Sequence, residues 1–202
     1  MTAPRRAAPL TTRLAQGAIL AAAVDVFGRR GFAGTRVEDI LAKAAISRRT
    51  FYKHFQSKED VLAAVYELCT GELLKAMGST EGPGRGPLDA LRRGLDVYLD
   101  YHVDNAPLVR VLVEQAIRSE SPLWPARRRF REDLVRALDG AVRATTGEEH
   151  DPMLYQALVS ALEGLSLDLL VRGPSATEVE RAKRVMHLML GRILSKGRRT
   201  TR

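Results

Sequence analysis

The stretch GFAGTRVEDILAKAAISRRTFYKHFQSKEDVL, residues 31–62, decides the fold of the chain. Apolar residues recur in it at helical spacing, and Ser47 is of a residue type that begins helices. We predict one helix from Thr35, where Thr35 and Glu38 form a capping box, and a short helix over residues 48–55. Because only a short turn separates the two, the pair is typical of a helix-turn-helix, whose second helix enters the major groove of DNA.

A helical wheel divides the short helix into two faces. Phe51 and Phe55 lie on one face, which we expect to pack against the two preceding helices. The other face carries the side chains of Arg48, Arg49, Tyr52 and Lys53. Such a face suits the phosphates and the guanine acceptors of DNA, whereas charge alone favours an ordinary solvated surface.

The charge of the chain is unusual and unevenly distributed. The 202 residues are 45% hydrophobic and 28% charged, as in a globular protein, but the net charge is +8. Residues 1–60 hold 11 basic and 5 acidic side chains, residues 61–191 hold 16 and 19, and the last eleven residues hold 5 basic side chains and no acid. A basic module on a slightly acidic body predicts one surface that meets a polyanion.

Cysteine use and the absence of several motifs exclude other classes of protein. Cys69 is the only cysteine, which excludes a disulfide framework and fits a reducing compartment, so we expect the cytoplasm. The apolar run at residues 18–24 is too short for a membrane span, and we expect neither a signal peptide nor an anchor. The four histidines are scattered, with no HExxH motif, nucleophile–base pair or dinucleotide fingerprint. We therefore expect no enzyme activity, no cofactor and no metal, and an exposed loop at residues 148–151.

Helical periodicity recurs along the whole chain and predicts an all-α fold. The first helix begins after Thr12 and ends near Arg30, and its apolar face includes Leu14, Ala18 and Phe27. Further helices are expected at residues 57–77, 88–105, 108–118, 125–144, 152–172 and 177–195, with a linker at residues 82–87. We predict an N-terminal arm and three-helix DNA-binding domain over residues 1–60. A larger helical ligand-binding and dimerisation domain with a basic tail is expected over residues 61–202.

Several short motifs of the N-terminal region stand in a recognisable order. They are Gly31-Phe32, Ala45-Ile46-Ser47, Thr50-Phe51-Tyr52 and, most specific, the Tyr-x-His-Phe-x-Ser-Lys-Glu run at residues 52–59. Together they resemble the DNA-binding domain of the TetR family of bacterial transcriptional regulators, over residues 19–65. The resemblance implies an α-helical homodimer that binds a palindromic operator and is released by a small-molecule inducer.

The same resemblance implies roles for individual residues. Arg48 and Arg49 become candidates for contacts to base edges. Thr35, Ser47, Thr50, Tyr52, His54 and Lys58 become candidates for contacts to the DNA backbone, and the basic Arg36 and Lys53 complete the set. The chain departs from the family pattern at Ala45, where the turn often has Gly, and at the Arg48-Arg49 pair, where smaller residues are often found.

Two details stay open at this point. The wheel places His54 nearer the packed side, so it either contacts a phosphate or forms a buried hydrogen bond. The N-terminal arm, with Arg5, Arg6 and Arg13, either reaches along the minor groove or is an ordinary mobile end.

A polar pair interrupts an apolar stripe in the body of the protein. Tyr98 and His102 lie in line with Leu95 and Leu99 on the helix expected at residues 88–105. Buried polar groups need partners, so the two either satisfy one another or line a ligand cavity. Trp124, Met153 and Tyr155 are further candidates for contact with that ligand.

The helix expected at residues 152–172 is apolar around most of its circumference and must be covered on more than one side. It either fills a monomer core or forms, with the final helix, a four-helix interface to a second copy. We expect a homodimer through the last two helices, double-stranded operator DNA and a small-molecule inducer as partners, and no membrane. A ligand-dependent activator, a dual regulator and a basic non-enzymatic interaction module are the alternatives to a repressor.

Overall fold

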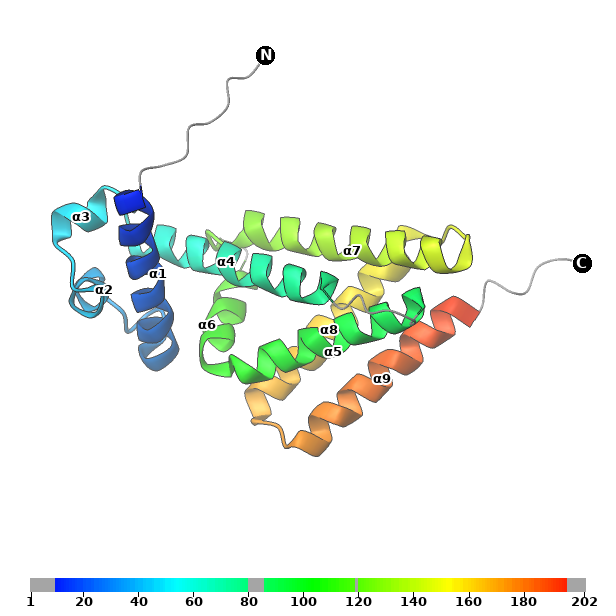
Figure 1. Ribbon diagram of the computed structural model, residues 1–202. Coiled ribbons are helices and arrows are strands. Elements are labelled where there is room, and N and C mark those ends of the chain that lie inside the picture. The colour runs from blue at the N-terminus through cyan, green and yellow to red at the C-terminus, as the bar shows by residue number, and fades with distance from the viewer. Residues whose placement is uncertain (1–9, 80–85, 119, 196–202) are drawn as a thin grey trace, which may run out of the picture.

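The computed structural model describes residues 10–79, 86–118 and 120–195, and over these residues it is helical with no strand (Figure 1). The helices are α1 (Leu10–Arg30), α2 (Val37–Ala44), α3 (Arg48–Tyr52), α4 (Lys58–Gly78), α5 (Pro87–Asp104), α6 (Ala106–Ala116), α7 (Trp124–Thr146), α8 (Pro152–Arg172) and α9 (Ala176–Ser195). The predicted all-α fold class is confirmed. Three predicted features lie outside the described residues: Arg5 and Arg6 of the N-terminal arm, residues 82–85 of the linker, and the basic tail after Ser195.

The short helix α3 ends earlier than predicted. It ends at Tyr52, because the chain then tightens: the N–H of Lys53 donates to Thr50 at 3.3 Å and that of His54 donates to Phe51 at 2.8 Å. These bonds span three residues instead of four, as is common in the last turn of a helix. Phe55 still reaches the core from this turn.

Helices α1 to α3 form one end of the molecule, and α4 leads from them into the remaining helices (Figure 1). Helix α1 packs against α2, α4 and α6. Gly28 of α1 faces the start of α6, where a Cβ atom would lie in ordinary van der Waals contact, 3.7 Å from Pro107 and Leu108. The N-terminal end therefore rests on α6 as well as on α4.

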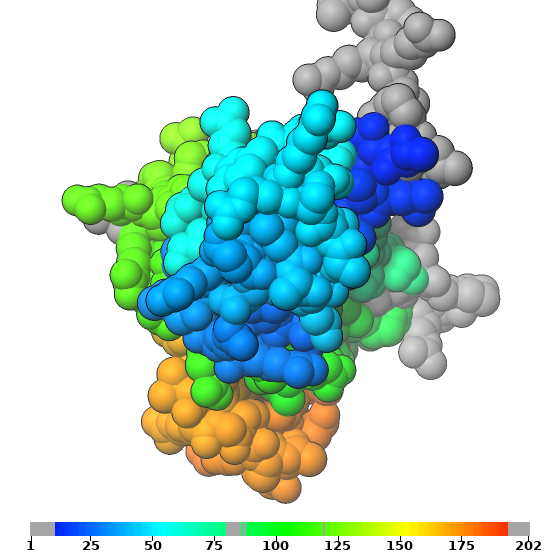
Figure 2. Space-filling model, turned by 90° about the vertical axis from the view of Figure 1, so that its left-hand side faces the viewer, coloured from blue at the N-terminus to red at the C-terminus, as the bar shows by residue number. Residues whose placement is uncertain are grey.

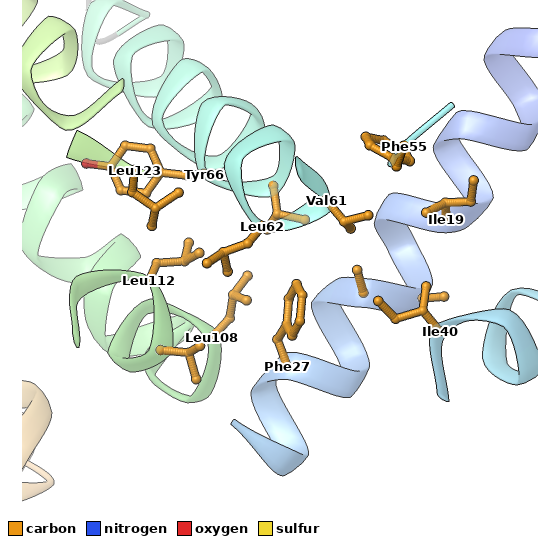
Figure 3. Close-up of a cluster of buried hydrophobic side chains, with 14 of the residues drawn as sticks. Ile19, Phe27, Ile40, Phe55, Val61, Leu62, Tyr66, Leu108, Leu112 and Leu123 are labelled. Atoms are coloured by element: carbon orange, nitrogen blue, oxygen red, sulfur yellow. The ribbon is translucent and has the colours of Figure 1, made fainter. Parts of the chain in front are cut away.

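The apolar core of this end includes side chains from both halves of the chain. Ile19 and Phe27 of α1 contribute to the same buried cluster as Leu62 of α4 and Leu108 and Leu112 of α6 (Figure 3). A second cluster joins α5, α7, α8 and α9, with a side chain from the later part of α4. Helix α4 thus belongs to both clusters, and the domain boundary predicted at residue 60 falls inside it.

The apolar face predicted for the first helix is wrong in its first turns. Leu14 is 64% exposed and Ala18 is also exposed, whereas Ile19 and Phe27 are fully buried. The reason is tertiary: among the described residues, the cluster that covers α1 contains α1 side chains only from Ile19 onward. Helical spacing shows which side chains share a face but not how far along the helix its neighbours reach.

The capping box predicted for α2 is also wrong. The residue that precedes the helix is Arg36, whose N–H donates to Asp39 Oδ2 at 2.8 Å. The hydroxyl of Thr35 donates instead to the carbonyl of Gly31 at 2.7 Å, and Glu38 pairs with Arg48 of α3. Only the carboxylate half of a capping box therefore forms, one residue later than the sequence suggested, because an arginine side chain cannot accept a hydrogen bond.

Candidate DNA interface and ligand cavity

Helix α3 is held in place by the two phenylalanines on its inner side. Phe51 is 0% and Phe55 is 6% exposed, and their ring centroids are 6.1 Å apart. Ser47 caps the helix, since its Oγ accepts the N–H of Thr50 at 3.1 Å. Five residues are too few for a helix that is stable alone, so packing against α1, α2 and α4 positions α3.

The other side of α3 forms the basic face. We define it as Arg48, Arg49, Tyr52 and Lys53, all of which are exposed. Figure 2 looks onto the end of the molecule that α1, α2 and α3 cover. The predicted division of the short helix into a packed and a basic face is confirmed, and the arrangement offers cationic donors and a phenol to one outer surface.

The turn between α2 and α3 contains a left-handed alanine. Ala45 has φ 53° and ψ 42°, and within the described ranges it is the one non-glycine residue with positive φ. The N–H of Ile46 donates to Leu41 at 3.3 Å and that of Ala45 donates to Ala42 at 3.4 Å, which is the hydrogen-bond pattern of a Schellman motif. The turn has the geometry that suits glycine, although alanine occupies it.

The two arginines of the basic face differ in their surroundings. Arg48 Nη2 lies 2.5 Å from Glu38 Oε1 on α2, and both side chains are more than half exposed. Among the described residues, the side chain of Arg49 forms no ion pair and no hydrogen bond. The ion pair with Glu38 therefore restrains the side chain of Arg48 against α2, whereas the side chain of Arg49 has no such restraint among the described residues.

Two residues expected to contact the DNA backbone have internal partners instead. Thr35 is 1% exposed, and its hydroxyl is used by Gly31, so its side chain does not reach the surface. The ammonium of Lys58 donates to the carbonyls of Phe32 and Thr35, at 3.0 Å each, and lies 4.4 Å from the centroid of the Phe32 ring. Lys58 thus joins the start of α4 to the loop between α1 and α2, and we reassign both residues to holding that loop.

The other predicted contacts lie at or near the surface. Arg36 and Ser47 are exposed, and Thr50 is half-buried with its hydroxyl 2.9 Å from that of Ser47. His54 is half-buried, so neither a fully buried role nor a fully solvated one describes it. These residues surround the basic face and remain candidates for phosphate contacts.

A cavity of about 360 Å³ lies among α4, α5, α6, α7 and α8. Its size falls within the range of about 300 to 1,000 Å³ usual for small-molecule sites. Most of its walls are apolar, from residues such as Leu73, Leu112 and Phe130. Leu112 and Tyr66 also belong to the core of the N-terminal end, so the cavity and that core share side chains.

Tyr98 and His102 both line this cavity, and they also contact one another. Their rings are stacked with centroids 4.1 Å apart, and His102 Nδ1 lies 2.8 Å from the carbonyl oxygen of Tyr98. Because a carbonyl only accepts, Nδ1 carries a proton. Burial lowers the pKa of His102 to about 4 despite the opposing effect of that hydrogen bond, so the imidazole is neutral near pH 7.

The other three predicted ligand residues do not line the cavity. Met153 is 70% exposed, and Tyr155 is 1% exposed within the second core cluster. Trp124 lies in a neighbouring surface groove together with Arg127 and Arg131. The sequence suggests these three residues as ligand contacts only by their aromatic or sulfur-containing side chains. Whether such a side chain points into the cavity depends on the positions of α7 and α8.

The charged cavity residues that sequence reasoning missed are Arg127, Arg131 and Glu163. The basic run of α7 resembles a solvated face, which concealed them. Their spacing carried a signal, because residues 127 and 131 share a helical stripe with the buried Phe130 and Leu134. Cys69 also lines the cavity, where burial raises the pKa of its thiol.

Two observations bear on metal and membrane binding. Among the described residues, no group of three or more His, Cys, Asp or Glu side chains is placed to hold a metal ion. Asp151 of the acidic segment caps α8 by accepting the N–H of Met153 at 2.9 Å.

Helix α8 is long and apolar enough to span a membrane, with a mean hydropathy of 1.4 over 18 residues, but buried core helices share that composition.

Comparison with known proteins agrees with this geometry. Residues 19–65 match the family model described as "Bacterial regulatory proteins, tetR family". An HTH-type transcriptional repressor of Mycobacterium tuberculosis is 32% identical over 92 residues, which cover 46% of this chain and 46% of that protein. The match thus spans about half the length of this relative.

Solved structures extend the likeness to the C-terminal helices. A regulatory protein in the tetR family from Rhodococcus has a TM-score of 0.66 at 26% identity, over 87% of this chain and 95% of that chain. The fatty acid degradation regulator FadR from Bacillus halodurans has a TM-score of 0.75 at 19% identity, over 93% and 97%, and shows likeness of fold. Residues 19–65 of the chain thus match the TetR family of bacterial regulatory proteins, and the helical fold beyond them is similar to that of a solved tetR-family regulator.

Proposed function

We propose that the protein is a transcriptional repressor that binds a palindromic operator as a homodimer and is released by a small-molecule ligand. The observation that carries the proposal is the exposed basic face of α3, held by Phe51 and Phe55 in a helix-turn-helix. In this proposal Arg48 and Arg49 read base edges, while Tyr52 and Lys53 contact phosphates. In this proposal the protein acts in the cytoplasm by binding DNA and a ligand, and it catalyses no reaction and uses no cofactor.

An open surface on α8 and α9 supports the homodimer. Val185 and Leu188 of α9 are 41% and 61% exposed, and Ala157 and Gly164 are exposed small residues on α8. A Cβ atom added at Gly164 would meet nothing within 4 Å, and Gly164 also lines the ligand cavity. Two copies of this face form a four-helix interface, and its two-fold symmetry matches paired operator half-sites.

Helix α6 supplies the route from the ligand to the DNA-binding end. Val109 and Leu112 of α6 line the cavity, and Leu108 and Leu112 also pack in the core beneath α1 and α4. A ligand that favours another position of α6 thereby changes the position of α1, which packs on it. The two recognition helices of the dimer then no longer match the half-site spacing.

Repression is the direction we propose, because the mycobacterial relative matched above is named a repressor. A ligand-dependent activator would use the same basic face and cavity. The two are separated by a reporter gene placed behind the bound DNA: deletion of the regulator raises expression for a repressor and lowers it for an activator.

The test of DNA binding uses the full chain and the DNA upstream of its own gene. At physiological salt the chain should prefer this DNA to a scrambled sequence of equal length. Arg49→Ala should lose about 1 to 3 kcal/mol of discrimination between bases, whereas Lys53→Ala should weaken all sequences alike and reduce the salt dependence. Arg136→Ala is the matched control, since Arg136 is an exposed arginine on α7 that pairs with Asp133. Equal affinity for native and scrambled DNA would refute the proposal.

A further inference from the structure

One end of the ligand cavity contains two arginines that share one carboxylate. Arg131 Nη1 of α7 pairs with Glu163 Oε2 of α8, and Arg131 Nη2 donates to Ser160 Oγ at 3.0 Å. Arg127 Nη2 lies 3.3 Å from the same Glu163 oxygen. The side chains of Arg127, Arg131 and Glu163 are only 22%, 27% and 20% exposed. We call these three residues the charged end of the cavity.

The charged end holds one positive charge in excess. Glu163 is the only acid among the residues that line the cavity. Burial raises the pKa of the Tyr66 and Tyr98 phenols and lowers that of His102, so all three are neutral near pH 7. Partly desolvated charge without a partner is costly, and the cavity therefore favours a ligand that brings a negative charge.

The remaining arginines on the outer side of α7 show that this imbalance is local. Each of them has an acid of its own, in the pairs Arg128–Glu132, Arg129–Glu67, Arg136–Asp133 and Arg143–Glu149. These pairs are exposed. The excess charge thus lies at Arg127 and Arg131, which line both the cavity and the neighbouring groove at Trp124, and not on the remaining arginines of α7.

The rest of the cavity requires an apolar ligand body of limited size. Leu73, Val109, Leu112 and Phe130 are among its walls. At roughly 30 Å³ for each water-sized group, a volume of about 360 Å³ holds about twelve non-hydrogen atoms. Charge and size together describe a small molecule with one anionic end.

We infer that the cavity binds an amphipathic monocarboxylate of about a dozen non-hydrogen atoms, whose carboxylate pairs with Arg127 and Arg131 and whose apolar body lies between Leu112 and Phe130. The inference rests on the proposed role of this cavity as the ligand site. A carboxylate is the anion favoured here because a guanidinium presents paired N–H donors that match its two oxygens. Both arginines already hold a carboxylate oxygen, Oε2 of Glu163.

Glu163 is the competitor of such a ligand. Its carboxylate already accepts from Arg131 and lies near Arg127, so the incoming carboxylate replaces it on at least one guanidinium. This exchange loosens the contact between α7 and α8 that Glu163 makes. It also predicts that removing the charge of Glu163 strengthens ligand binding, which would not follow if the arginines served only to hold α8.

The test is calorimetric titration of the full chain, without DNA, with octanoate and 4-phenylbutanoate and with the corresponding neutral amides and octylammonium. The carboxylates should bind at least about tenfold more tightly than the amides, as expected for a hydrogen-bonded charge, and octylammonium should bind least. Glu163→Gln should tighten carboxylate binding several-fold and leave amide binding unchanged. The double variant Arg127→Gln/Arg131→Gln should bind carboxylate and amide equally.

Arg129→Gln is the matched control, because Arg129 lies on the same helix, pairs with Glu67 and does not line the cavity. Thermal unfolding of each variant verifies that it is folded. Equal binding of carboxylate and amide by the unaltered chain, no binding of either carboxylate, or weaker carboxylate binding by Glu163→Gln would overturn the inference. Carboxylate binding by a chain that selects no operator DNA would refute the proposed function and leave the ligand class standing.

Discussion

The left-handed alanine in the turn between α2 and α3 makes a sharp prediction about stability. Ala45 has φ 53° and ψ 42°, a conformation that costs a residue with a Cβ atom about 1 to 2 kcal/mol. Ala45→Gly removes this cost, but the freer glycine backbone in the unfolded chain offsets about 0.4 to 1 kcal/mol of the gain. The bonds from Ile46 to Leu41 and from Ala45 to Ala42 use backbone atoms and are kept. We therefore expect a gain of about 0.5 to 1 kcal/mol.

The assay is urea and thermal unfolding followed by circular dichroism. For a chain of this size the gain corresponds to a rise in Tm of about 1 to 4 °C. Ala42→Gly is the matched control, because Ala42 is exposed within α2 and the same change should destabilise by about 1 kcal/mol. If Ala45→Gly is no more stable than the unaltered chain while Ala42→Gly loses stability as expected, the argument from backbone strain is wrong.

Three further predictions concern DNA binding, pH and assembly. Glu38→Gln releases Arg48 and removes a negative charge beside the basic face. Operator affinity should therefore rise by up to about fivefold, which corresponds to ~1 kcal/mol for an exposed pair. A loss of affinity in a gel-shift titration would contradict this prediction. The pKa of His102 is about 4 in the folded chain and 6.5 in the unfolded chain. As the pH falls, the unfolded chain therefore binds a proton at His102 before the folded chain does. The contribution of His102 to the free energy of unfolding is complete above pH 6.5 and decreases toward pH 4. Urea unfolding should show the unaltered chain losing up to about 3 kcal/mol more than His102→Gln between these pH values, and equal losses would refute the assignment. Leu188→Asp should shift the chain to monomers in sedimentation analysis, whereas Leu14→Asp, equally exposed on α1, should not; an unchanged dimer would exclude the α8–α9 face.

The sequence predicted the parts of the site that depend on local spacing. The cap at Ser47, the burial of Phe51 and Phe55 and the exposure of the basic face all follow from positions along single helices. Most helix bounds were also predicted to within a few residues, because proline, glycine and capping residues act on the chain next to them. The apolar stripe with two polar members left open whether Tyr98 and His102 contact one another or line a cavity, and in the structure they do both.

The surroundings of other predicted site residues depend on a second element of the fold. The family resemblance implied DNA-backbone contacts for Thr35 and Lys58, whereas in the structure their side chains bind the loop after α1. Trp124, Met153 and Tyr155 were assigned to the ligand by residue type, and the packing of α7 on α8 directs them elsewhere.

The sequence by itself determined an all-helical chain with a basic helix-turn-helix at its N-terminal end, because helical period, caps and the two-faced short helix are local properties. Only the tertiary structure decided that Glu38 braces Arg48, that Lys58 closes the loop between α1 and α2, and that Glu163 meets two arginines. These pairs join residues that are far apart in the sequence or on different helices. Their distances depend on how apolar faces pack, which no periodicity within one helix records.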